Sequence, residues 1–289
     1  KGGTGKSLFS YITAQYLISL GADVTCIDCD PITPTLIEYK ALNPKRLDIM
    51  EGTNIEKTKF DRFVELIVAG SEDQHFIIDN GTSSFVALAD YLTANEIVPF
   101  LNSMHHTVTF HVVIVGGDNL VGSLGGFQYI TKNFKNDAMI LVWLNPFFGP
   151  VQKDGKTFDQ FSIVLENPPF AQINYPDFPK DMFGKSFARL QKDRLTFAEV
   201  CDAERAPEGY DLMTCHRLNM MRDQIFKMLE AVFELFVPLV IKGIIDYGIA
   251  AEDRAYCLRM GLLLLLLAVI GHYSAVVFCK SGSRLCSEN

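Results

Sequence analysis

The sequence has no excess of basic residues. It carries 26 lysines and arginines against 34 aspartates and glutamates, a formal net charge of −8 over 289 residues. A protein that wraps nucleic acid through its overall electric field needs the opposite sign of charge. Any nonspecific contact with DNA must therefore be local. The basic residues that share one face of a predicted helix are Lys185, Arg189 and Lys192, and a solvated helix face is the alternative interpretation.

The sequence also lacks the cysteine spacing of a small disulfide-linked scaffold. Its seven cysteines are odd in number and scattered along the chain, which fits reduced thiols in a reducing compartment. Cys26 and Cys29 have the spacing of a redox or metal pair, but no second pair stands at ligand distance. We therefore expect both to pack in the core. No signal peptide, internal repeat or low-complexity linker is visible.

Short apolar runs alternate with helical patterns from residue 1 to about residue 205. This alternation predicts an α/β domain with a mostly parallel sheet flanked by helices. The expected strands are 24–28, 76–79, 97–100, 109–115, 139–144 and 171–174. The expected helices are 6–20, 59–69, 84–94, 119–134, 180–192 and 196–203.

The pattern changes in the last third of the chain. Residues 206–237 have the apolar spacing of an amphipathic helix, and residues 238–289 form an apolar tail. Within the tail, residues 261–278 carry no formal charge, a run just long enough to cross a bilayer. Basic residues on both sides leave the orientation of this transmembrane candidate open, and a buried helix is the alternative.

A glycine-rich phosphate-binding loop opens the chain. In such loops backbone N–H groups surround phosphate oxygens, a lysine neutralises the β and γ phosphates, and a hydroxyl ligates Mg²⁺. The following apolar helix would point its N-terminus at the phosphates. We therefore expect a nucleotide and Mg²⁺ to bind here. The loop residues are Lys1, Gly2, Gly3, Thr4, Gly5, Lys6 and Ser7.

A loop of this kind connects a strand to a helix. No residue precedes Lys1, and there is no initiator methionine. We expect the first strand of the fold to be missing from this chain, which would then be an N-terminally truncated P-loop domain.

Polar side chains follow three of the predicted strands. Asp28 and Asp30 lie at the end of the first, where one carboxylate can join the magnesium shell while the other faces the γ-phosphate. Asp79 ends an apolar strand, the pattern that holds Mg²⁺ through water. Asn145 ends a later strand, where an amide can read an adenine edge. A guanine-binding N-K-x-D motif is absent at this position, so ATP is the expected nucleotide.

These motifs, in this order, resemble the deviant P-loop ATPases of the ParA/MinD family. The resemblance implies that Lys1 reaches the phosphates of the partner in an ATP-dependent homodimer, that Asp30 orients the attacking water, and that Asp28 supports the metal site. It makes Lys1, Lys6 and Asp30 the catalytic residues, with Ser7, Asp28 and Asp79 around the metal. The sequence departs from the family at residues 80–85, where Asn-Gly-Thr-Ser-Ser-Phe replaces a proline-containing segment.

The later segments refine the resemblance. Residues 77–85, 142–150 and 194–197 look most like ParA-type proteins of plasmid conjugal-transfer operons, and the likeness covers about residues 1–235. It implies slow, partner-stimulated ATP hydrolysis that positions or assembles a type IV secretion and DNA-transfer apparatus. It also implies protein partners from that machinery and a place in the bacterial cytoplasm, at the inner membrane if the tail is an anchor.

Other classes of protein remain open at this point. A P-loop kinase or an oxyanion-pump ATPase would share the phosphate loop. A membrane-associated structural subunit could bind nucleotide without turnover. The tail from 238 onward is a membrane anchor, a fused product or a frame-shifted end.

Overall fold

The computed structural model describes residues 3–71, 73–201 and 206–234, with single residues beyond them. Lys1, Gly2 and nearly all of the apolar tail lie outside this description. Contacts divide the chain into two compact units, Lys1–Ile225 and Phe226–Asn289. The fold of the first unit concerns the site. The boundaries expected near residues 205 and 237 stay predictions.

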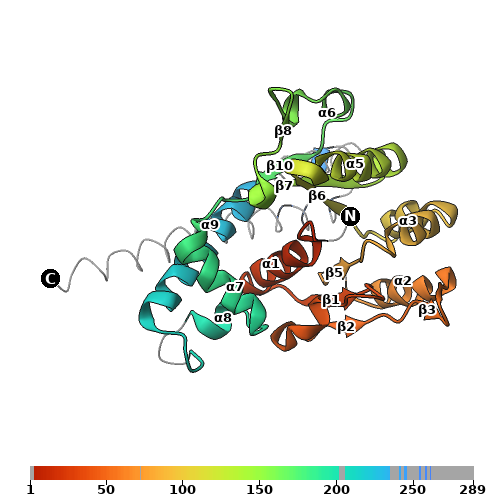
Figure 1. Cartoon of the computed structure of the whole chain (residues 1–289). Helices are drawn as coiled ribbons and strands as arrows, with labels where there is room; N and C mark the ends of the chain where they lie inside the picture. The colour runs from red at the N-terminus through yellow and green to blue at the C-terminus, as the bar shows by residue number, and fades with distance from the viewer. Residues whose placement is uncertain are drawn as a thin grey trace. The chain divides into compact units, whose positions relative to one another are not determined.

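The described chain alternates strands and helices, as its hydrophobic pattern predicts (Figure 1). The helices are α1 (Lys6–Ser19), α2 (Asp61–Val68), α3 (Phe85–Ala94), α4 (Ile97–Ser103), α5 (Leu120–Phe134), α6 (Ser162–Glu166), α7 (Lys185–Lys192), α8 (Phe197–Val200) and α9 (Leu212–Glu234). The strands are β1 (Val24–Asp28), β2 (Lys45–Arg46), β3 (Met50–Glu51), β4 (Asn54–Ile55), β5 (His75–Asp79), β6 (Thr109–Val115), β7 (Met139–Asn145), β8 (Gln152–Lys153), β9 (Lys156–Thr157) and β10 (Ala171–Asn174).

The parallel strands form two sheets of three, ordered β2-β1-β5 and β10-β7-β6. In Figure 1, β5 and β6 are the strands of the two sheets nearest to each other. Among the described residues β5 pairs with β1 and β6 pairs with β7, each along one edge only. The α/β fold with parallel sheets is thus confirmed. The expectation that a strand preceding Lys1 belongs to the sheet stays a prediction.

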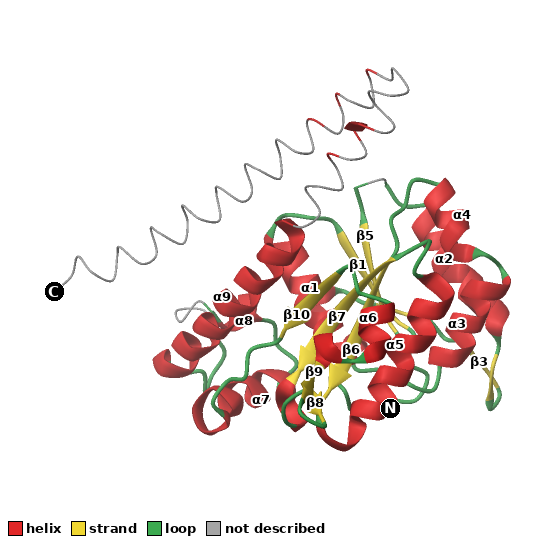
Figure 2. Cartoon of the chain, turned by 90° about the horizontal axis from the view of Figure 1, so that it is seen from above, coloured by secondary structure: helices red, strands yellow, loops and turns green. Residues whose placement is uncertain are grey.

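One hydrophobic core runs beneath both sheets. It joins alternate residues of the strands to apolar faces of α2 to α5, and its members include Ile27, Phe63, Ile114, Phe127 and Val142. Alternation along a strand sends the next residues to the opposite face. There helix α1 packs against β1 and β5. Within the first unit, Figure 2 shows α1, α7, α8 and the start of α9 (residues 212–225) on one side of the strands and α2 to α5 on the other.

An aromatic contact ties α1 to the second sheet. Phe9 stacks on Trp143 of β7 with 4.3 Å between ring centroids, and both rings are almost fully buried. The Trp143 indole N–H donates to Nδ1 of His111 at 3.0 Å. Burial of large rings with a partner for the indole N–H is strongly stabilising. The helix that follows the phosphate loop is therefore held by both sheets.

The predicted strand at 97–100 is wrong, because these residues begin helix α4. Ile97, Val98 and Leu101 are buried, and their spacing places them on one face of a helix. Pro99 sits in the first turn, where a missing N–H costs little. A short apolar run does not distinguish a strand from a buried helix by periodicity alone.

The segment after β7, where the sequence predicts neither a strand nor a helix, contains a short hairpin. Residues 152–157 form the antiparallel hairpin β8–β9. Asp154 and Gly155 have φ angles of 52° and 74°, which suits a two-residue hairpin turn of this composition.

The transmembrane candidate at 261–278 lies outside the described residues apart from Gly261. Among the helices that the structure describes, none has the length and apolar character needed to cross a membrane.

Candidate functional site

The phosphate loop enters helix α1 through left-handed glycines. Gly3 and Gly5 have φ angles of 77° and 98°. Residues other than glycine rarely adopt this region. Gly5 is the N-cap residue of α1, and its carbonyl accepts from the Phe9 N–H at 3.0 Å. The first N–H groups of α1 have no helical acceptor, and they make the helix start suitable for an anion.

Asn145 fastens this loop to the end of β7. Its side-chain amide donates to the Thr4 carbonyl at 3.1 Å, and its oxygen accepts from the Phe147 N–H at 3.1 Å. A Cβ atom added to Gly5 would lie 3.1 Å from the Asn145 amide nitrogen. The side chain is buried, and both its amide nitrogen and its amide oxygen are hydrogen-bonded within the protein. Its predicted contact with adenine stays untested.

Lys6 lies between two acids and a hydroxyl. Its Nζ donates to Thr82 Oγ1 at 3.0 Å. Burial lowers the pKa of Lys6, and the charges of Asp79 and Asp30 oppose that shift. The ammonium group thus stands beside the loop that follows β5, next to the acids at the ends of β1 and β5.

Asp79 is a buried carboxylate with one unpartnered oxygen. Its side chain is 2% exposed, and Oδ1 accepts from the Ser10 hydroxyl at 3.0 Å. Oδ2 has no hydrogen-bond partner among the described residues. Burial raises the pKa of Asp79 to about 6, against the opposing effect of hydrogen bonding from Ser7. A buried carboxylate oxygen without a partner is costly, and a cation bound by oxygen ligands would satisfy it.

Asp28 and Asp30 are only two residues apart, but their carboxylates accept hydrogen bonds from different groups. Asp28 is fully buried, and its two oxygens accept from the backbone N–H groups of Asp30 and Ile37, each at 3.0 Å. Burial raises the pKa of Asp28. This side chain holds the shape of the loop after β1, so its predicted place in the metal site rests on the resemblance alone.

Asp30 is partly exposed and has its own set of donors. Oδ1 accepts from the N–H groups of Ile32 and Thr33, and Oδ2 accepts from the Thr33 hydroxyl at 3.0 Å. Burial would raise the pKa of Asp30, but these hydrogen bonds outweigh it and lower the pKa below the usual value. The carboxylate is therefore ionised at neutral pH.

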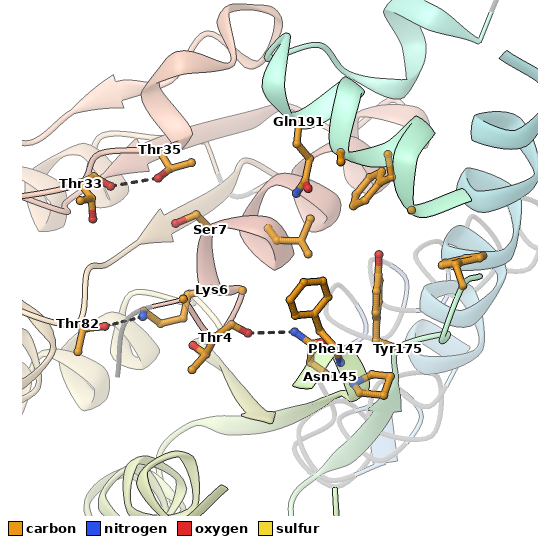
Figure 3. A pocket seen from close by; sticks show the side chains of 18 of the residues that line it. Thr4, Lys6, Ser7, Thr33, Thr35, Thr82, Asn145, Phe147, Tyr175 and Gln191 are labelled. Atoms are coloured by element: carbon orange, nitrogen blue, oxygen red, sulfur yellow. Dashed lines mark hydrogen bonds between the residues drawn. The ribbon is translucent and has the colours of Figure 1, made fainter. Parts of the chain in front are cut away.

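A cavity of about 830 Å³ opens over the phosphate loop (Figure 3). Its volume lies in the range of small-ligand sites. It is lined by residues from four places: the loop and α1 start (Gly3, Thr4, Gly5, Lys6, Ser7, Leu8), the loop after β1 (Asp30, Ile32, Thr33, Thr35), the loop after β5 (Asn80, Thr82, Ser83), and the segments after β7 and β10 with α7 and α9 (Asn145, Pro146, Phe147, Tyr175, Pro176, Asp177, Phe178, Lys180, Gly184, Phe187, Ala188, Gln191, Met221). The carboxyl ends of the strands thus meet at one site, as expected for parallel sheets.

The structure brings most of the predicted residues together. Thr4, Gly5, Lys6, Ser7 and Asp30 line the cavity. Asp28 and Asp79 are opposite each other in register at the ends of β1 and β5, but they are not among the lining residues. Lys1 and Gly2 lie outside the described residues, so their predicted roles stay predictions.

Sequence reasoning missed part of the cavity wall. It did not single out Thr82, which follows Asp79 closely, nor Tyr175 and Gln191 from the later segments. The signal for Thr82 was the departure from the family pattern at residues 80–85. Tyr175 comes directly after β10, so the rule that ligands bind at strand ends could have found it.

Among the described residues, no group of three or more histidine, cysteine, aspartate or glutamate side chains is placed to hold a metal ion. Cys26 and Cys29 are buried, and burial raises the pKa of each thiol to about 12. On α7, Arg189 donates to the Gly209 carbonyl, lies 3.5 Å from Asp193 and stacks over Tyr210. This basic face is therefore partly neutralised.

The chain is 39% identical over 233 residues to a protein named Protein TraL from Escherichia coli, an alignment that covers 80% of this chain and 94% of that protein. A second Protein TraL from the same species is 39% identical over 232 residues, with the same shares of both chains. No family model matches the sequence. No solved structure matches it.

Proposed function

The chain belongs to the family of TraL proteins, and from that premise we propose that it is an ATP-dependent dimerisation switch of the ParA/MinD type acting in plasmid conjugal transfer. One observation carries the proposal. A loop with left-handed glycines leads into α1 at the wall of a cavity that Lys6 also lines. Helix α1 contacts the buried carboxylate of Asp79, which has an oxygen without a hydrogen-bond partner among the described residues.

The residues present fit Mg²⁺. This ion prefers oxygen ligands and keeps several waters. Ser7 offers a hydroxyl and Asp79 a carboxylate oxygen with no hydrogen-bond partner among the described residues. When bound, Mg²⁺ supplies charge that neutralises the β and γ phosphates. Ser7 would hold the ion through its hydroxyl and Asp79 through its carboxylate.

The remaining polar groups have separate tasks. Lys6 and the N–H groups of the loop stabilise charge on the transferred phosphoryl group. Asp30 is ionised and faces the cavity, so it can accept a hydrogen bond from the attacking water and orient it. Lys1 would supply a second cation to the site of a partner subunit. The lowered pKa of Asp30 makes it a weak base, which fits slow hydrolysis.

Apolar side chains at the mouth support dimerisation. Ile32 is 71% exposed and Phe147 is 61% exposed, and both line the cavity. A large apolar side chain beside a charged site is stabilised when another surface covers it. A second copy of the chain, closing over bound ATP, would cover both. The output of this cycle would be the positioning or assembly of the transfer apparatus through its own proteins.

Nucleotide binding tests the proposal at its base. We expect ATP to bind with an affinity that Mg²⁺ increases, and Lys6→Ala to weaken binding by about tenfold or more. Lys132→Ala, on the exposed side of α5, is the matched control and should bind as the parent does. Equal ATP binding by parent and Lys6→Ala would contradict the proposal. ATP binding without turnover would instead identify a nucleotide-binding structural subunit.

A further inference from the structure

The loop after β5 touches both charged groups of the site. Its residues 80–84 connect Asp79 to helix α3, and Ser84 anchors it by donating to the Gly81 carbonyl at 3.2 Å. Ser84 is fully buried, so this end of the loop is fixed. Earlier in the loop, Gly81 lies against Asp30 and Thr82 contacts Lys6.

Gly81 lies directly against the Asp30 carboxylate. A Cβ atom built on Gly81 would stand 2.3 Å from Asp30 Cγ and 2.4 and 2.5 Å from its two oxygens. The Cβ atoms of real residues essentially never come this close to a non-bonded atom, so any side chain at position 81 must displace Asp30 or the loop. The backbone of Gly81 does not have a positive φ angle. Space for Asp30, and not backbone strain, is therefore the reason that glycine stands here.

Thr82 holds the ammonium group of Lys6. Both acids attract Lys6 electrostatically, yet its hydrogen bond goes to the neutral hydroxyl of Thr82 at 3.0 Å (Figure 3). A hydrogen bond from a charged donor is stronger than one between neutral groups. Oγ1 of Thr82 thus accepts a hydrogen bond from Lys6 that a phosphate oxygen could otherwise accept.

We propose that Gly81 and Thr82 are positioning residues: Gly81 leaves the space in which the Asp30 carboxylate sits, and Thr82 holds Lys6 until a phosphate replaces it. The role of the phosphate rests on the proposed function, whereas the two contacts do not. Through them the loop links the residue that orients water to the residue that binds phosphate. When the nucleotide binds, Thr82 loses its hydrogen bond from Lys6, and the loop can then change its conformation next to Asp30.

The Thr82 contact is tested by chemical labelling of lysines in the nucleotide-free protein, mapped by mass spectrometry. We expect Thr82→Val to raise the labelling rate of Lys6 by about two- to tenfold, the factor that corresponds to one lost hydrogen bond. Thr82→Ser keeps the hydroxyl and should label as the parent does. Lys132 serves as the internal standard. An unchanged Lys6 rate in Thr82→Val, or a raised rate in Thr82→Ser, would overturn the assignment.

The Gly81 contact is tested by a double-mutant cycle on thermal stability. Gly81→Ala should lower Tm by several degrees in the parent protein. It should change Tm little in an Asp30→Ala background, because the atoms it meets are gone. Gly122→Ala is the control, since a Cβ there meets nothing within 4 Å. Equal losses from Gly81→Ala in both backgrounds would contradict the proposal.

A kinetic measurement separates positioning from structure. At a temperature where both proteins are folded, Gly81→Ala should lower kcat for ATP by tenfold or more with a small change in KM. Thr82→Val should bind ATP more tightly, by the same two- to tenfold, because nothing competes for Lys6. Weaker binding in Thr82→Val would overturn that part. If the parent neither binds nor hydrolyses ATP, the proposed function fails, and labelling and the stability cycle still decide whether the loop positions Lys6 and Asp30.

Discussion

Asp28 and Asp79 stand opposite each other in register at the ends of β1 and β5, but their carboxylates are held in different ways. Asp28 accepts from two backbone N–H groups, one at each oxygen. Asp79 accepts from Ser10 at one oxygen and has no described partner at the other. The two neighbouring buried acids are therefore held differently: Asp28 shapes a loop, whereas Asp79 keeps an oxygen for the Mg²⁺ ion of the proposed function.

The first prediction contrasts these two acids. Asp28→Asn replaces an acceptor by a donor that faces a backbone N–H, so it should lower the free energy of unfolding by about 1–3 kcal/mol. Asp79→Asn removes a desolvated charge and should leave metal-free stability unchanged or slightly higher, while it abolishes the effect of Mg²⁺ on ATP binding. Urea denaturation and nucleotide titrations measure both. A large stability loss in Asp79→Asn together with intact Mg²⁺ dependence would reverse the two assignments.

The second prediction concerns Asn145. Because its amide bonds to Thr4 and Phe147, Asn145→Ala should loosen the phosphate loop itself. We expect about tenfold weaker binding of ATP, GTP and pyrophosphate alike, with the preference for ATP over GTP preserved. Competition binding with the three ligands measures this. A selective loss of ATP binding, with pyrophosphate unaffected, would show instead that Asn145 reads adenine.

The third prediction concerns Cys26 and Cys29. Their thiols are buried with pKa values raised to about 12, and the thiolate is the reactive form. Both should resist alkylation in the folded protein at pH 8 and react fully in urea. Cys201, which is partly exposed, is the internal comparison and should react before Cys26 and Cys29. Rapid labelling of Cys26 or Cys29 in the folded protein, or formation of a disulfide between them, would support the redox alternative.

The fourth prediction uses the contact between α1 and β7. Phe9→Ala removes the ring that stacks on Trp143 and should lower the free energy of unfolding by about 3–5 kcal/mol. Trp143 is the single tryptophan of the chain, so its fluorescence reports the packing directly. Phe148→Ala, at an exposed ring, is the matched control and should cost under about 0.5 kcal/mol. Similar losses in both variants would show that Phe9 is not part of the core.

The sequence predicted the parallel strands and most helices because alternating and helical patterns are local. The prediction failed at α4, because a four-residue apolar run is too short for its period to distinguish a strand from a helix. There the buried face is set by contacts with α3 and the core. The sequence also singled out the glycine-rich loop before α1 and the acids at the ends of β1 and β5, because glycines ahead of a helix and an acid after an apolar run are local patterns. It did not find the engagement of Asn145, the anchoring of Asp28 or the contact of Gly81 with Asp30. These depend on residues far apart in the chain, and no local pattern encodes them.

Turnover tests the central claim, that this member of the TraL family is an ATP switch. The rate of phosphate release from ATP should be measured with and without Mg²⁺ for the parent, Asp30→Ala and the control Asp159→Ala. The account predicts slow, Mg²⁺-dependent hydrolysis in the parent and the control, and loss of hydrolysis with retained ATP binding in Asp30→Ala. Hydrolysis that is independent of Mg²⁺, or undiminished in Asp30→Ala, would contradict it.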